Sequence, residues 1–135
     1  PGEDVLVVDA GTCITLEMIE KSGKYLGGSI HPGIKMRLDS MHQYTGKLPL
    51  LAPVFSPHLI GNDTATCMQA GAVLGAAMEI DGFISAYLTQ YPDCKVILTG
   101  GDADKFFSML KNEIFALPNL VLVGLQKIAQ YNVTY

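Results

Sequence analysis

The sequence predicts an α/β domain with a mixed sheet that begins as a meander of three antiparallel strands. Residues 5–8 form a β-branched apolar run, residues 14–19 alternate apolar and polar side chains, and residues 25–31 follow after a short turn. Short connections between neighbouring strands are typical of antiparallel pairs. A helical segment at 64–90 and an apolar strand at 95–98 come next, so the order of elements predicts helices that flank a single sheet.

The turn between the first two strands is the strongest candidate for a functional site. The first strand ends at Asp9, and the chain turns through Ala10, Gly11 and Thr12 before the second strand begins. Gly11 permits a tight turn and lets a ligand approach the backbone closely. The turn therefore gathers a carboxylate, backbone N–H groups and a hydroxyl, which suit a cation and phosphate oxygens. Taken alone, such a turn is also typical of an ordinary connection between two core strands.

The third strand and the helix after it raise two structural questions. Gly27 and Gly28 inside a strand indicate a bulge or the close approach of another backbone. His31, at the end of this strand, could be a ligand, although packing against Pro32 is the commoner role. Residues 34–44 are expected to form a helix. Its inner face is expected to carry Ile34, Met36, Leu38 and Met41.

A long irregular stretch and a long helix occupy the middle of the chain. Residues 45–62 contain several prolines, and a loop of this length tends to be functional or to cover a partner. Asn62 or Asp63 can cap the helix that follows. Gly71 and Gly75 lie one turn apart on one face of that helix, so another helix could approach closely. That helix could belong to the same chain or to a second subunit.

The last part of the chain carries a second glycine pair. The strand at 95–98 runs into Thr99, Gly100 and Gly101, and such glycines let the backbone lie against a base or a phosphate. Many α/β connections carry a similar pair without binding a ligand. A helix is expected at 103–110, with Phe106, Phe107 and Leu110 pointing inward. The remaining residues are expected to form a short strand at 120–123 and a helix at 124–130.

Length and composition indicate a compact globular protein. The chain has 135 residues, enough for one domain with its own core, and 49% of them are hydrophobic. We expect no membrane partner, because Gly, Pro or charged residues interrupt each apolar run before it reaches the length of a span. The net charge of −4 argues against nucleic-acid binding. No secretory leader pattern is present, so we expect a cytoplasmic protein. Residues 1–4 suggest a junction, so we also expect the chain to be a fragment.

The cysteines also indicate a cytoplasmic protein. The chain has three, Cys13, Cys67 and Cys94, which fit neither a zinc-ligand spacing nor a disulfide framework. We therefore expect small buried residues in a reducing environment.

Six short motifs follow one another along the chain, at residues 7–15, 23–34, 60–64, 69–71, 81–82 and 99–101. Each is loose by itself, but their common order and spacing are specific. From Val5 to Gln130 the chain resembles the C-terminal half of a type III pantothenate kinase. The order of elements is also that of one lobe of the ribonuclease H-like fold, which the actin-like and sugar-kinase superfamily uses in pairs around a nucleotide cleft.

The resemblance implies a function and a set of site residues. It implies ATP-dependent phosphorylation of pantothenate to 4′-phosphopantothenate, the first step of coenzyme A biosynthesis, with magnesium accompanying ATP. Asp9 would bind an activating monovalent cation, potassium or ammonium, and Thr64 would line the pantothenate site. The implied ATP contacts are Gly11, Thr12, Gly100 and Gly101. Members of this family are cytoplasmic homodimers with the second helix at the interface, which fits Gly71 and Gly75.

The sequence also departs from the family pattern. Cys13 stands where the family usually has Ala, and His31 stands where it often has Ala or Cys. More importantly, the family's D-x-G-N-T phosphate loop and its G-A-D-R segment, which supplies the general base, do not occur in these 135 residues. Phosphoryl transfer depends on groups from both sides of the cleft. We therefore expect residues 1–135 to be a single C-terminal lobe that carries no catalytic base and is inactive by itself.

Two other functions remain open at this point. The chain could be a regulatory or transcriptional accessory protein, a role described for some members of this family. It could also be a non-catalytic lobe that binds a nucleotide or a sugar acid.

Overall fold

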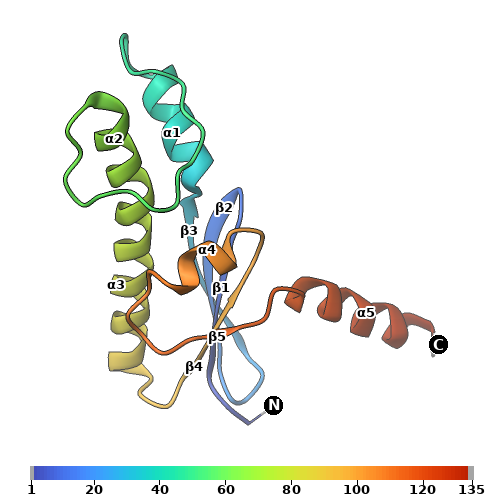
Figure 1. Ribbon diagram of the computed structural model, residues 1–135. Coiled ribbons are helices and arrows are strands. Elements are labelled where there is room, and N and C mark those ends of the chain that lie inside the picture. The colour runs from blue at the N-terminus through green and yellow to red at the C-terminus, as the bar shows by residue number, and fades with distance from the viewer. Residues whose placement is uncertain (1, 134–135) are drawn as a thin grey trace.

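The computed structural model describes residues 2–133 and contains a five-stranded sheet in the order β3-β2-β1-β4-β5 (Figure 1). The strands are β1 (Val5–Ala10), β2 (Cys13–Ile19), β3 (Tyr25–Pro32), β4 (Lys95–Thr99) and β5 (Phe115–Ala116). The first three strands pair antiparallel, whereas β1 pairs with β4, and β4 with β5, in parallel. The predicted mixed sheet with its meander is therefore confirmed.

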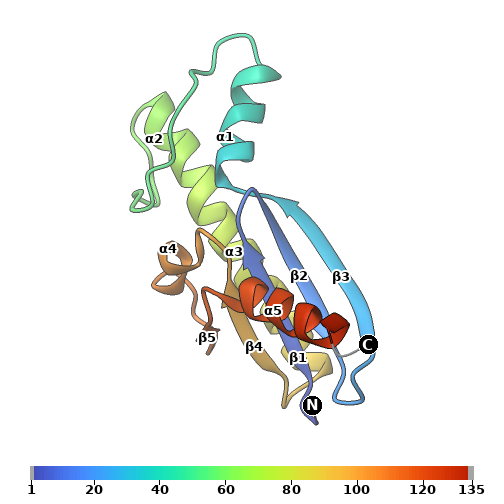
Figure 2. The same cartoon turned by 90° about the vertical axis from the view of Figure 1, so that its right-hand side faces the viewer.

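The helices are α1 (Ile34–Gln43), α2 (Thr64–Gln69), α3 (Gly75–Gln90), α4 (Ala103–Phe107) and α5 (Leu120–Val133). Between α2 and α3, η1 (Ala70–Leu74) is a π-helical turn, so the three form one continuous rod. The predicted long helix is confirmed, and the π-helical turn inside it was not predicted. The long rod and α1 lie on one side of the sheet, and α5 projects on the other side (Figures 1 and 2).

The core lies between the sheet and the long helix. Alternate residues of the central strands, such as Leu6, Leu16 and Leu98, are fully buried, because successive side chains of a strand point to opposite faces. The helices bury residues spaced by three or four positions, such as Ile80 and Ile84 on α3. Of the predicted inner face of α1, Ile34 and Leu38 are buried, Met41 is half-buried and Met36 is exposed.

The continuous helix Thr64–Gln90 has 27 residues and is long and apolar enough, by those two measures, to cross a membrane. The sequence-based expectation that no segment reaches that length is wrong for this helix. Its inward side packs on the sheet through residues that belong to the main core. This is the arrangement of the central helix of a globular domain.

The glycine pair of β3 has the predicted structural role. The pairing between β2 and β3 shifts register at Met18 and Ile19, opposite Gly27. Gly27 has a φ of +93°, and a Cβ at Gly28 would overlap the backbone of Leu16. The strand therefore needs a bulge at one glycine and close backbone approach at the other.

His31 takes part in an ion-pair cluster that joins β3, α1 and α3. Its Nδ1 contacts Glu79, its Nε2 lies 2.7 Å from Ser29 Oγ, and Arg37 donates to the second oxygen of Glu79. The ring of Phe83 packs against the His31 ring. Burial opposes ionisation of Glu79, but the hydrogen bond and charge of Arg37, together with His31, outweigh it and lower the pKa of this carboxyl. These contacts give His31 a structural role.

Asp81 attaches the segment after α4 to the long helix. Its carboxylate accepts hydrogen bonds from the backbone N–H groups of Lys111 and Asn112, at 2.9 and 3.2 Å. The Asn112 side chain donates to the same carboxylate at 2.9 Å. An acidic residue in an otherwise apolar helix is thereby explained by the loop that it holds.

Four expectations about individual segments are wrong. Residues 120–123 form the first turn of α5 and not a strand, since Val123 N–H donates to Asn119 O at 3.0 Å. An unbroken apolar run of this length does not distinguish a strand from a helix. The helix predicted at 103–110 ends at Phe107, whose side chain is 49% exposed. Cys67 is exposed, whereas Cys94 is buried.

Helix α5 leaves its apolar side chains in solvent. None of its residues that the structure describes is buried, and Leu122, Leu125 and Ile128 are 65%, 57% and 61% exposed. The spacing of these three residues places them close to one face of the helix.

Candidate functional site

The structure brings the two glycine-containing segments together at one edge of the sheet. Because β1 and β4 run parallel, both end at the same edge, and Asp9 pairs with Thr99. The turn of Gly11 and Thr12 follows β1, and Gly100 follows β4. In open α/β sheets, ligands bind outside the carboxyl ends of the parallel strands, which is where these segments lie.

Gly100 is the closest point of contact between the two segments. Its φ is +99°, and a Cβ at this position would overlap both Asp9 Oδ1 and Ala10 O. The N–H of Asp102 donates to Ala10 O at 2.8 Å, which fastens the start of α4 to the end of β1. Glycine is therefore required at this position, because the Asp9 carboxylate and the Ala10 carbonyl leave no room for a side chain.

A second glycine packs against the turn from the side of α1. The N–H of Gly33 donates to Thr12 O at 3.0 Å, and a Cβ at Gly33 would overlap the carbonyl oxygens of Gly11 and Thr12. The Gly11 N–H in turn donates to Cys13 O at 2.9 Å. These contacts hold the backbone of the turn, while the Thr12 side chain stays exposed.

A cavity of about 840 Å³ opens beside this turn. It is lined by the turn itself, by α1, by the long irregular loop and by the start of α4. Its chemistry-bearing lining residues are Thr12, Lys35, Asp39, Tyr44, Phe55, Asp102 and Lys105. A cavity of this size is typical of small-molecule sites.

The charged groups of this cavity are paired. Lys105 Nζ lies 2.8 Å from Asp102 Oδ1 and 4.3 Å from the centre of the Phe55 ring. Lys35 forms an ion pair with Asp39 one turn along α1. Sequence reasoning missed these lysines, because no short motif marks them. The one available signal was the length of the 45–62 loop, which supplies Phe55.

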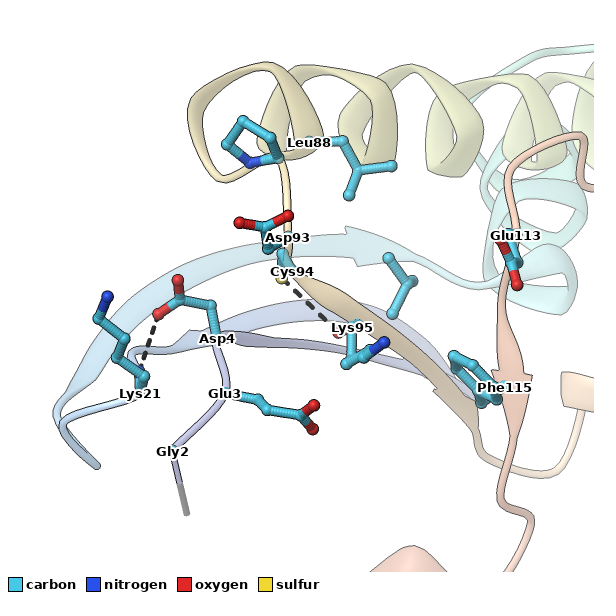
Figure 3. A pocket seen from close by; sticks show the side chains of 12 residues that line it. Gly2, Glu3, Asp4, Lys21, Leu88, Asp93, Cys94, Lys95, Glu113 and Phe115 are labelled. Carbon is cyan, nitrogen blue, oxygen red and sulfur yellow. Dashed lines mark hydrogen bonds between the residues drawn. The ribbon is translucent and has the colours of Figure 1, made fainter.

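A second cavity, of about 580 Å³, lies at the opposite edge, beside the start of β1 and β4 (Figure 3). Asp4, Lys21, Leu88 and Phe115 are among the residues that line it. The N–H of Lys21 donates to Asp4 Oδ1 at 2.8 Å. None of the predicted site residues lines this cavity, so we assign the candidate site to the other edge.

Thr64 lies apart from the turn. It is exposed at the first position of α2, where Asp63 caps the helix by accepting from Thr66 N–H at 2.8 Å. The backbone N–H and the hydroxyl of Thr66 lower the pKa of the Asp63 carboxyl. Thr64 does not line the cavity beside the turn, so its role in binding pantothenate stays a prediction.

The oxygen atoms at Asp9 fit a hard cation. Among residues 2–133, no group of three or more His, Cys, Asp and Glu side chains is placed to hold a metal ion. Asp9 Oδ1 and the Ala10 carbonyl oxygen nevertheless lie close to each other beside Gly100. Carboxylate and carbonyl oxygens are ligands of alkali and alkaline-earth cations. These two oxygens therefore suit such a cation, with its other ligands coming from the backbone and from a bound molecule.

The two adjacent glycines provide a matched test of this arrangement. We expect Gly100→Ala to destabilise the fold by about 1–3 kcal/mol, because it adds backbone strain at a positive φ and an overlap with Asp9 and Ala10. Gly101→Ala should be nearly neutral, because its Cβ would meet no atom within 4 Å. Urea unfolding of both variants measures the difference. Equal stabilities would contradict the close packing of β4 against β1.

Comparisons with known proteins agree with these features. The family model for type III pantothenate kinase matches residues 1–86. A type III pantothenate kinase of Bacteroides fragilis is 48% identical over 132 residues, which cover 98% of this chain and 54% of that protein. Those of Flavobacterium johnsoniae and Christiangramia forsetii are 45% and 43% identical, with 98% and 99% of this chain covered and 54% and 55% of theirs. The chain spans about half the length of the curated relatives it matches.

A solved structure shares the fold. A protein of Campylobacter jejuni described as a Baf family transcriptional activator superposes with a TM-score of 0.67 at 24% identity, over 98% of this chain and 60% of that one. Because the family model matches residues 1–86, which is more than half of the chain, the chain belongs to the type III pantothenate kinase family.

Proposed function

We propose that this chain is the C-terminal lobe of a type III pantothenate kinase, and that the intact enzyme phosphorylates pantothenate with ATP to give 4′-phosphopantothenate. The observation that supports this most directly is the close contact of Gly100 with Asp9 and Ala10, at the carboxyl ends of two parallel strands. The adjoining cavity is large enough for a nucleotide. A cytoplasmic location follows from the proposed step of coenzyme A biosynthesis.

Two observations support a second lobe in the intact enzyme. The chain spans about half the length of its curated relatives. Helix α5 projects away from the sheet (Figure 1), and the residues Leu122 and Leu125 of its apolar face are exposed. Such a face is usually covered in a complete protein. We therefore assign residues 1–135 to one lobe, with the other lobe supplying the rest of the cleft.

The proposed role of this lobe is to bind and orient ATP. The Thr12 hydroxyl would donate to phosphate oxygens, while Gly11, Gly100 and Gly101 would lie against the nucleotide. A monovalent cation at Asp9 would offset the repulsion between this carboxylate and the phosphates. Thr64 would contact pantothenate. Since catalysis of phosphoryl transfer is mostly positioning and charge stabilisation, these residues act by fixing the nucleotide in place.

The direct test compares the lobe with the full-length kinase that carries it. With ATP, magnesium, potassium and pantothenate, the full-length protein should form 4′-phosphopantothenate, whereas this chain alone should show no turnover above background. The reason is that the phosphate loop and the general base do not occur in its sequence. Mass-spectrometric detection of 4′-phosphopantothenate measures the activity of both proteins. Turnover by the chain alone contradicts the assignment to one lobe, and an inactive full-length protein contradicts the proposed function.

Asp9→Asn in the full-length kinase tests the cation site. The change removes one charge and keeps the shape, so it should raise the potassium requirement and the KM for ATP together, each by about tenfold or more. The pH profile of kcat should stay unmoved. Glu17→Gln is the control and should behave as wild type, because Glu17 lies on the neighbouring strand β2 and on the same face of the sheet as Asp9. If the variant keeps normal activation by potassium but loses the part of its pH profile that reports the general base, Asp9 is the base instead.

A homodimer is proposed through the exposed stripe of the long helix. Gly71, Gly75, Met78 and Gly82 follow one another at intervals of three or four residues, and a Cβ at any of these glycines would meet no atom within 4 Å in this chain. The stripe would let a second copy approach closely.

Gly71→Leu should therefore shift sedimentation toward the monomer without unfolding the domain. Gly46→Leu, in an exposed part of the loop with equally open space, is the control. A wild-type chain that sediments as a monomer at high micromolar concentration rules out this interface.

A further inference from the structure

The cavity beside the turn contains an ammonium group that the sequence motifs do not mark. We infer that Lys105 binds the phosphate chain of the nucleotide, and that Asp102 and Phe55 set its position. This inference rests on the proposed function, because it assigns a nucleotide to this cavity. It adds a binding residue to those that the motifs imply.

The backbone of Lys105 is fixed relative to the turn. Asp102, three residues before it, donates its N–H to Ala10 O at 2.8 Å, and its own carbonyl accepts from the N–H groups of Lys105 and Phe106 at 3.1 and 3.2 Å. The Phe106 side chain is fully buried in the core. Lys105 therefore lies on a short helix, α4, whose start is hydrogen-bonded to the end of β1.

The ammonium group is held between an acid and an aromatic ring. Lys105 Nζ lies 2.8 Å from Asp102 Oδ1 and 4.3 Å from the centre of the Phe55 ring, a distance at which a cation is attracted to the ring face. The Phe55 ring in turn packs edge to face on Phe106, with 6.4 Å between the ring centres. The long side chain of Lys105 is thereby confined at the cavity wall.

The loop that carries Phe55 is itself anchored by Gln69. The side-chain amide of this buried residue donates to Ala52 O at 2.7 Å and accepts from Val54 N–H at 3.0 Å. Because both bonds go to the backbone within three residues before Phe55, they hold this part of the loop in place. The 45–62 loop thus has a definite task at this site, which is to support the ammonium group of Lys105.

The surroundings of Lys105 favour a phosphate ligand. The exposed hydroxyl of Thr12 and the ammonium group of Lys105 open into the same cavity. The pair of Lys105 with Asp102 is reached by water, with side chains 47% and 24% exposed, and such pairs contribute only about 0–1 kcal/mol. Lys105 can therefore exchange Asp102 for a polyphosphate, which carries more charge. The other lysine of the cavity, Lys35, is 73% exposed and has no comparable support.

The test measures ATP binding to the full-length kinase by calorimetry and its kinetics in parallel. Lys105→Met keeps the apolar stem and removes the charge, so the Kd and KM for ATP should rise about tenfold, the usual effect of losing one charge-assisted hydrogen bond. The kcat and the KM for pantothenate should stay near wild type. Lys105→Arg should retain most of the affinity. Lys24→Met, at the exposed β2–β3 turn, is the control.

Two further measurements identify the contact. Tripolyphosphate should lose affinity for the Lys105→Met protein as ATP does, whereas adenosine should bind both proteins equally. The difference between wild type and variant should shrink as salt rises to about 1 M, where charges are screened over a few ångströms. Lys105→Gln gives the same loss of charge if methionine disturbs the packing on Phe55.

Unchanged ATP affinity in Lys105→Met and Lys105→Gln overturns the inference and leaves the proposed function intact. An equal loss of adenosine affinity also overturns it, since the side chain would then act on the base or on the fold. Weakened ATP binding in a full-length protein that forms no 4′-phosphopantothenate supports the Lys105 contact and overturns the proposed kinase activity instead.

Discussion

The close contact of three backbone segments around the first turn is the constraint on which the rest of this structure depends. The turn of Gly11 and Thr12 lies between Gly33 and Gly100, and neither neighbour has space for a methyl group. Glycine is needed at both positions because carbonyl oxygens of the β1 end and its turn occupy the space that a side chain would take. The starts of α1 and α4 are thereby placed against the end of β1 and its turn, and the cavity lies between these helices.

The sequence predicted the elements that local patterns specify, and it failed where tertiary contacts decide. The strands of the meander and the long helix follow from composition and periodicity. The apolar residues 120–123 were misassigned, because such a run is compatible with either element, and only the Asn119–Val123 hydrogen bond shows the helix. Phe106 and Phe107 are neighbours of one type, yet one is buried and the other is exposed. Which of two adjacent phenylalanines faces the core depends on where the helix lies, which no local pattern specifies.

The candidate site also contains residues that the sequence predicted and residues that it did not. The turn of Asp9 and Thr12 and the segment at Gly100 were each predicted, because glycine-rich turns after strands are recognisable in a sequence, and the structure brings Gly100 against Asp9. Lys105 and Phe55 were not predicted. They come from a short helix and an irregular loop, and their proximity depends on the side chain of Gln69 in a third segment. Contacts between three distant segments leave no periodic signal.

The π-helical turn η1 has a consequence for the length of the central helix. A π turn contains about one residue more than an α turn, and each residue of an α-helix advances the side-chain direction by about 100°. Deleting one residue from Ala70–Leu74 would convert this turn into a regular α turn, so α2 and α3 would keep nearly the same rotation relative to each other. Gln69 would then still face the loop, and Glu79 and Asp81 would keep their partners. The central helix therefore carries one extra residue in η1 without turning the side chains on either side of it, and related sequences that lack this residue can retain the Gln69 contacts.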